Sequence, residues 1–176
     1  MLKTIAAKLI ARNEKRLGVS LDYVHAISQT NTGLLMRYSK IFGFLDPVKH
    51  VPAEAYHIAR LRAAMAADCG TCVQAEINLA EQAGMNGDTI RQVLASDYSS
   101  LTEPLAQTAR LTDTVVNRRE DDPEARAAII DAYGEAGLIE LSFAMNGAAL
   151  LPGIKRAMGY ATACDLEIMK IKNRAA

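Results

Sequence analysis

Apolar residues recur at spacings of three and four along almost the whole chain, which is the period of an amphipathic α-helix. Alanine is abundant and alternating β-branched residues are scarce, so the composition also favours helices over strands. No βαβ unit, internal repeat or low-complexity linker interrupts the pattern. The sequence therefore predicts an all-α protein, a compact bundle of helices with short connections.

Glycine, proline and capping residues predict where these helices begin and end. Gly18 ends the first helix, Pro52 suits the first turn of the fourth, and Gly84 ends the fifth. We expect Pro152 and Gly153 to break or kink the pattern before a last segment that carries Lys155 and Arg156. The expected helices cover about 2–17, 22–29, 34–42, 52–67, 68–84, 88–94, 103–117, 123–137 and 138–151.

The length of 176 residues suits one domain with a substantial core. Half of the residues are hydrophobic and 23% are charged, as in ordinary globular proteins. We expect a single domain over 1–176: N-terminal helices over about 1–50, a core that carries a cysteine pair over about 52–159, and a C-terminal tail.

The charge balance gives no reason to expect nucleic acid as a partner, because 20 basic residues offset 20 acidic ones. No apolar run approaches the length that spans a membrane. Lys8 and Arg12 interrupt the N-terminal apolar stretch, which favours an amphipathic helix over a secretory signal; an organellar transit segment is the weaker alternative. Three cysteines cannot all pair within one chain, so we expect a reducing, cytoplasmic location.

The stretch DCGTCVQAE at 68–76 places two of the three cysteines in a Cys-x-x-Cys pair. A structural zinc site needs four ligands, and only Cys164 remains among the thiols. His57 and Glu76 would complete an unusual ligand set, so we expect no metal and no cofactor. Two small buried cysteines are a second alternative, and a working dithiol is the third.

The local physics favours the dithiol. Cys69 and Cys72 are neighbours on one face of a helix, since they stand at positions i and i+3. Near a helix start, unpaired N–H groups and the helix dipole favour the reactive thiolate. Gly70 and Thr71 are small and leave room for a peroxide or a partner disulfide. A thioredoxin fold needs strands around this motif, which the sequence does not predict.

If the chain reverses near Ala67, the flanking helices form an antiparallel hairpin. His57 then lies about 15 Å back along one helix, and Glu76 about 12 Å along the other. Cys72 stands one turn before Glu76, on the same face. The three side chains are therefore expected to converge, as a base, a carboxylate and a nucleophile do in an activated site.

The stretch 52–84 resembles the AhpD-like alkylhydroperoxidases of the carboxymuconolactone decarboxylase superfamily. Their motif is Glu, eleven residues, Cys-x-x-Cys, three residues, His, then an alanine-rich helix that ends in glycine. Here His57 and Glu76 stand at these spacings with the two outer residue types exchanged. The segment LIELSFAMNGAALLPGIKRAMG at 138–159 also looks like the final core helix of the family.

The resemblance implies an all-helical fold, assembly into trimers or hexamers, and peroxide reduction by a relay of Glu, Cys, Cys and His. It implies that Cys72 is the peroxidatic thiol and Cys69 the resolving thiol. A sulfenic acid on Cys72 would condense with Cys69 to a disulfide. An external dithiol, such as a lipoyl-bearing or thioredoxin-like protein, would then reduce that disulfide.

The exchanged residues allow two interpretations: a member that has lost its relay, or a swap that keeps both groups across the hairpin. We favour the swap, with Cys72, Cys69, His57 and Glu76 as catalytic residues. Two other functions stay open, a lactone decarboxylase-like lyase and a non-enzymatic, redox-responsive helical oligomer. The Cys-x-x-Cys counts against the lyase, because decarboxylation needs no dithiol.

The remaining polar candidates are expected to have structural roles. His25 is expected to be packed or at the surface, and His50 to be a loop or capping residue. Arg60 and Arg62 are expected to form surface salt bridges. Cys164 is expected in the core or against a neighbouring subunit.

Overall fold

The computed structural model describes residues 2–45, 49–162 and 169–171, and the prediction of an all-α protein is confirmed there: these residues form helices and no strand. Helix boundaries mostly agree with the sequence pattern to within a few residues. The elements are α1 (Leu2–Leu17), α2 (Asp22–Thr30), α3 (Thr32–Ser39), η1 (Lys40–Leu45), α4 (Ala53–Ala66), α5 (Gly70–Gln82), α6 (Gly87–Leu94), α7 (Glu103–Thr112), η2 (Asp113–Arg118) and α8 (Pro123–Ala157).

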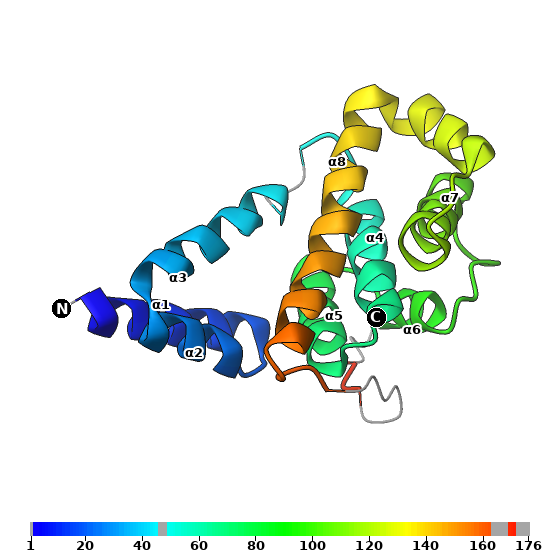
Figure 1. The fold of residues 1–176 in the computed structure, drawn as a ribbon. Helices are drawn as coiled ribbons and strands as arrows, with labels where there is room; N and C mark the ends of the chain where they lie inside the picture. The colour runs from blue at the N-terminus through cyan, green and yellow to red at the C-terminus, as the bar shows by residue number, and fades with distance from the viewer. Residues whose placement is uncertain (1, 46–48, 163–168, 172–176) are drawn as a thin grey trace.

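Helix α4 is the centre of the molecule. All residues from Ala55 to Ala64 are buried, and α5, α6, α7 and α8 pack around them (Figure 1). A helix that is buried on every side is expected to present mostly small or apolar groups. Ala55, Ala59 and Ala63, one turn apart, meet this need and are fully buried. The central position of α4 also forces its polar residues, His57 among them, into the interior.

Helix α8 breaks at Gly134, where φ is 73° and ψ is 173°, three residues before the predicted boundary at Gly137. A left-handed φ favours glycine, so Gly134 makes the bend. Gly137 serves packing instead: a Cβ there would lie 2.5 Å from the Tyr133 Cβ and 3.1 Å from Val51 Cγ1. The predicted break at Pro152 is wrong, because the helix continues through this buried proline to Ala157.

By length and composition alone, α8 is apolar enough to cross a membrane, with a mean hydropathy of 1.3 over its most apolar window. Of that window, 39% is buried inside the protein. Because α8 also packs along α4 and α7, much of its apolar surface serves the core. Composition alone is weak support for a membrane span.

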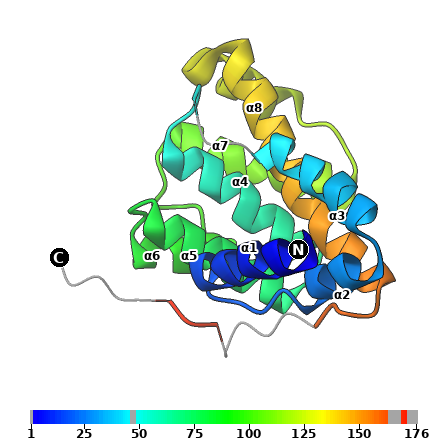
Figure 2. The ribbon, with the colours of Figure 1, turned by 90° about the vertical axis from the view of Figure 1, so that its left-hand side faces the viewer.

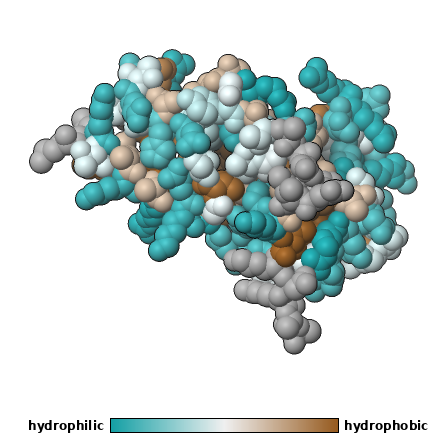
Figure 3. Space-filling model, turned by 90° about the horizontal axis from the view of Figure 1, so that it is seen from below, coloured by the Kyte–Doolittle hydropathy of each residue, from teal (hydrophilic) through white to brown (hydrophobic). Residues whose placement is uncertain are grey.

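The N-terminal helices α1, α2 and α3 form a separate layer on one side of α8, with α6 and α7 on the other side (Figures 1 and 2). A second, smaller hydrophobic cluster joins this layer to α8, and its buried members are Ile10, Tyr23, Val24 and Tyr38. Asn31 begins α3 by accepting hydrogen bonds from the N–H groups of Gly33 and Leu34. Seen from below, the surface is mostly hydrophilic with small hydrophobic patches (Figure 3).

Candidate functional site

The cysteine pair lies at the start of α5, directly after the connection from α4. Asp68 turns the chain with a left-handed φ of 46°, and Cys69 is the N-cap residue of α5. The Cys69 and Cys72 Sγ atoms are 2.7 Å apart, and both residues are free cysteines. The two sulfurs therefore touch, as the i, i+3 spacing predicts, without being joined in a disulfide.

The hydrogen bond between the two thiols shifts their pKa values in opposite directions. The hydrogen bond between the two thiols, together with the Cys72 backbone N–H, lowers the pKa of Cys69 to about 5, although burial opposes this shift. The same hydrogen bond and burial raise the pKa of Cys72. These shifts favour the thiolate form at Cys69 over the thiolate form at Cys72. This agrees with the general effect of a helix N-terminus on a cysteine.

Access to the two sulfurs differs. Cys69 has an exposed fraction of 0%, whereas Cys72 is half-buried. The chain returns after α8 and covers the start of α5: the Gly70 N–H donates to the Thr162 carbonyl at 3.1 Å, and the Thr71 and Thr162 hydroxyls lie 3.0 Å apart. A molecule arriving from solvent therefore meets Cys72 first.

Glu76 lies in a buried ion pair with Arg60. Arg60 Nε and Nη2 donate to the two carboxylate oxygens at 2.7 and 2.8 Å, and Nη1 donates to the Tyr56 hydroxyl at 2.9 Å. Arg60 and Glu76 are only 7% and 6% exposed, so the prediction of a surface salt bridge for Arg60 is wrong. The Glu76 carboxylate was expected to face His57. It binds Arg60 instead, which lies one helical turn nearer the α4–α5 connection.

His57 is buried on α4 beside Tyr56, with the two rings edge to face at 5.4 Å. Its Nδ1 has no hydrogen-bond partner among the described residues. Burial and then the Arg60 charge lower the pKa of His57 to about 4, while Glu76 opposes the shift. No hydrogen bond connects His57 to Glu76 or to either cysteine in the described part of the chain. His57 is thus a neutral imidazole, and it lies close enough to Glu76 for the carboxylate charge to affect its pKa.

This burial predicts an acid sensitivity of the fold. The native pKa of His57 is about 4 and the unfolded value 6.5, so the unfolded chain binds this proton first. Stability should therefore fall as the pH drops from about 6.5 to 4, by about 3 kcal/mol in total. Urea unfolding at pH 7 and pH 4 should show a smaller difference for His57→Gln than for the wild type. His50→Gln, at an exposed position, is the control; an unchanged difference in His57→Gln would contradict the assignment.

Lys155 and Tyr23 belong to the surroundings of the dithiol, and the sequence reasoning missed both. Lys155 is 5% exposed, and its Nζ lies 5.5 Å from the centre of the Tyr23 ring. Its positive charge lowers the pKa of both cysteines. Burial above all, and then the charges of the two cysteines, raise the pKa of Tyr23 to about 12. The Tyr23 hydroxyl also bonds the Tyr38 hydroxyl at 2.5 Å.

A signal for Lys155 is present in the sequence. It follows Leu141, Ala148 and Pro152 at helical spacing on the buried face of α8, so the periodicity places a lysine on an apolar stripe. The expected break at Pro152 removed it from that stripe. A helix that continues through the proline brings Lys155 back into the core.

The other candidates lie away from the dithiol or in structural contacts. His25 Nε2 is 3.3 Å from Glu14, and the His50 backbone N–H donates to the Glu140 carboxylate at 2.7 Å. Arg62 is buried, not at the surface as predicted, and binds Asp113 at 2.8 Å. Cys164 lies outside the described residues. Within 2–45, 49–162 and 169–171, no group of three or more His, Cys, Asp or Glu side chains is arranged to hold a metal ion.

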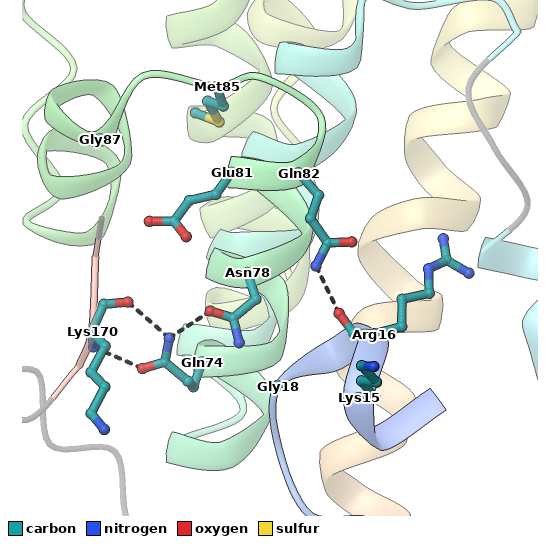
Figure 4. Close-up of a pocket in the computed structure, with 10 residues that line it drawn as sticks. All are labelled: Lys15, Arg16, Gly18, Gln74, Asn78, Glu81, Gln82, Met85, Gly87 and Lys170. Carbon is teal, nitrogen blue, oxygen red and sulfur yellow. Dashed lines mark hydrogen bonds between the residues drawn. The ribbon is translucent and has the colours of Figure 1, made fainter. Parts of the chain in front are cut away.

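A polar pocket of about 420 Å³ lies further along α5, between the end of α1 and the start of α6 (Figure 4). The Gln74 amide donates to the Lys170 carbonyl at 2.9 Å and accepts from its N–H at 2.8 Å. Gln82 donates to the Arg16 carbonyl at 2.7 Å. The pocket wall thus ties α1 and residue 170 to α5, and neither cysteine lines it.

No family model, curated protein or solved structure matches this chain. The arrangement of the side chains is therefore the basis for a functional assignment.

Proposed function

We propose that this protein reduces peroxides with the Cys69–Cys72 dithiol. The observation that carries the proposal is the contact of 2.7 Å between two free sulfurs at a helix start. One cysteine is buried and has a lowered pKa of about 5, and the other is half-buried and has a raised pKa. A purely structural pair of cysteines requires neither the contact nor the opposite pKa shifts.

The two cysteines, one proton from solvent and an external dithiol account for the whole reaction cycle. Cys72 Sγ attacks one oxygen of a hydroperoxide while its proton passes to the Cys69 thiolate. The O–O bond breaks, the alkoxide takes a proton from solvent and leaves as an alcohol, and Cys72 becomes a sulfenic acid. Cys69 then attacks the Cys72 sulfur, and its proton leaves with the hydroxide as water. The peroxide is reduced by two electrons, the two cysteines form a disulfide, and an external dithiol restores them.

In this proposal His57 and Glu76 influence the dithiol without taking part in the covalent steps. His57 is neutral above about pH 4 and keeps an unpaired Nδ1, so it can accept a proton through a water. Glu76 is held by Arg60 and contributes negative charge near both His57 and Cys72. Cys69, in direct contact with Cys72, is the nearer base.

The proposal includes an AhpD-like arrangement of the α4–α5 pair, a cytoplasmic location and a homo-oligomer. Support for the oligomer comes from an apolar surface on α8, where Ile139, Phe143 and Leu150 are about half exposed at helical spacing. Phe44 of η1 extends this surface, with its ring 5.4 Å from that of Phe143. Light scattering of the purified chain measures the number of subunits; a monomer would contradict this part.

The decisive experiment is peroxide consumption with dithiothreitol as the reductant, paired with a titration of free thiols. The proposal predicts turnover, and it predicts that one equivalent of peroxide without reductant removes two of the three thiols. Peptide mapping should place the new disulfide between Cys69 and Cys72. One observation favours a second candidate, the non-enzymatic redox-responsive protein: Cys69 is completely covered. Disulfide formation without turnover in excess dithiothreitol would establish that alternative.

A further inference from the structure

A groove of about 480 Å³ lies between α2, α3, η1 and α8, and Tyr38 of the tyrosine pair lines it. Its volume falls within the range of about 300–1,000 Å³ that is usual for small-molecule sites. Most of its lining is apolar and comes from Ile27, Leu34, Ile41, Ile154 and Met158. A groove with this lining suits an extended hydrocarbon chain.

Two polar residues of the groove lie at different depths, one at the rim and one at the floor. Arg37 is exposed at the rim and is the one charged residue among the described residues that line it. Its guanidinium makes no hydrogen bond or ion pair with another described residue. Tyr38, 8% exposed, forms the floor. A free guanidinium beside an apolar surface is complementary to an anion with a hydrocarbon tail, and its planar fork fits a carboxylate.

The floor of the groove is connected to the dithiol region. The Tyr38 hydroxyl bonds the Tyr23 hydroxyl, and the Tyr23 ring lies under the Lys155 ammonium. Lys155 in turn lies close enough to both cysteines for its positive charge to lower their pKa values. Tyr38 at the floor of the groove is therefore linked to the dithiol region through Tyr23 and Lys155.

We propose that this groove binds long-chain carboxylates, with the alkyl chain between α3 and α8 and the carboxylate on Arg37. The substrate inference rests on the proposed peroxide reduction. If that reaction occurs, the groove selects long-chain hydroperoxides that carry a carboxylate as substrates. The binding site itself does not depend on that reaction, because an unreactive carboxylate fits it equally well.

The test uses dodecanoate, at concentrations where it is monomeric, in isothermal titration calorimetry with the full chain. Leu34→Trp fills the groove and should weaken binding at least about tenfold, while Met36→Trp, on the same helix but outside the groove, should not. Arg37→Ala should weaken binding about 2–5-fold, and Lys40→Ala should leave it unchanged. Octanoate should bind at least about tenfold more weakly than dodecanoate, since each fully buried methylene is worth about fourfold. Dodecyltrimethylammonium, with the charge reversed, should bind more weakly than dodecanoate.

Three results overturn the proposal: no binding of dodecanoate, equal binding by wild type and Leu34→Trp, or tighter binding of the cation than of the carboxylate. If a second copy of the chain covers the groove, dodecanoate will not bind and Leu34→Trp will change the oligomer mass. Failure of the peroxidase proposal is distinguishable, because a protein that binds dodecanoate but consumes no peroxide keeps the groove and loses the reaction. If both the groove and the peroxidase proposals hold, Leu34→Trp should lower kcat/KM for a long-chain hydroperoxide acid but not for hydrogen peroxide.

Discussion

Cys72→Ser should reduce peroxide consumption at least about 1,000-fold, to the rate without protein. Cys72 is the accessible sulfur of the pair, and a serine hydroxyl at this position is a far weaker nucleophile. The measurement is the initial rate of peroxide loss with excess dithiothreitol. Cys164→Ser, which removes the one other cysteine of the chain, is the matched control and should retain activity.

Cys69→Ser separates the two roles within the pair. It removes both the thiolate that accepts the Cys72 proton and the resolving thiol, so turnover should also fail. Cys72 can still be oxidised once, and a sulfenic-acid reagent such as dimedone should label it in Cys69→Ser and not in Cys72→Ser. In the wild type, activity should decline as the pH falls through about 5, because the pKa of Cys69 lies there and its thiolate is then protonated. Full activity of Cys72→Ser, or labelling confined to Cys69, would refute the assignment of roles.

Arg60→Met should destabilise the protein by about 3–5 kcal/mol, because it leaves the Glu76 carboxylate buried without its partner. Urea unfolding followed by circular dichroism at neutral pH measures the loss. The double variant Arg60→Met, Glu76→Leu removes both charges, and it should recover most of the stability.

Arg91→Met is the matched control for this experiment. Its pair with Asp88 is exposed on both sides, so its loss should cost less than about 1 kcal/mol. A loss below about 1 kcal/mol for Arg60→Met would mean that water or another group solvates Glu76 in the folded state. A double variant no more stable than the single one would show that Arg60 contributes by packing rather than by charge.

The local chemistry of the sequence predicts most of the fold. The helix expected over 2–17 agrees with α1, and a left-handed glycine, Gly18, ends it as predicted. The contact between Cys69 and Cys72 is equally local, because two residues at i and i+3 of a helix start are neighbours whatever surrounds them. Predictions of this kind succeed because the interactions that decide them lie within a few residues.

The errors arise where one helix meets another. Arg60 and Arg62 look like surface residues, since charged side chains are rarely buried unless they are paired. Their partners, Glu76 and Asp113, are 16 and 51 residues away. The sequence pattern of α4 does not reveal those partners. The helix is buried on every side, so its periodicity does not show which face each arginine lies on.

By itself, the sequence determined the helical class, most helix boundaries and the pairing of two thiols at a helix start. Only the tertiary structure decided which groups surround that pair. Arg60 rather than His57 meets Glu76, and Lys155 and Tyr23 approach the thiols from α8 and α2. The physical reason is that the register between packed helices depends on the turn at Asp68 and on the fit of whole surfaces. A shift of one helical turn changes every contact across the interface and leaves the pattern along each helix the same.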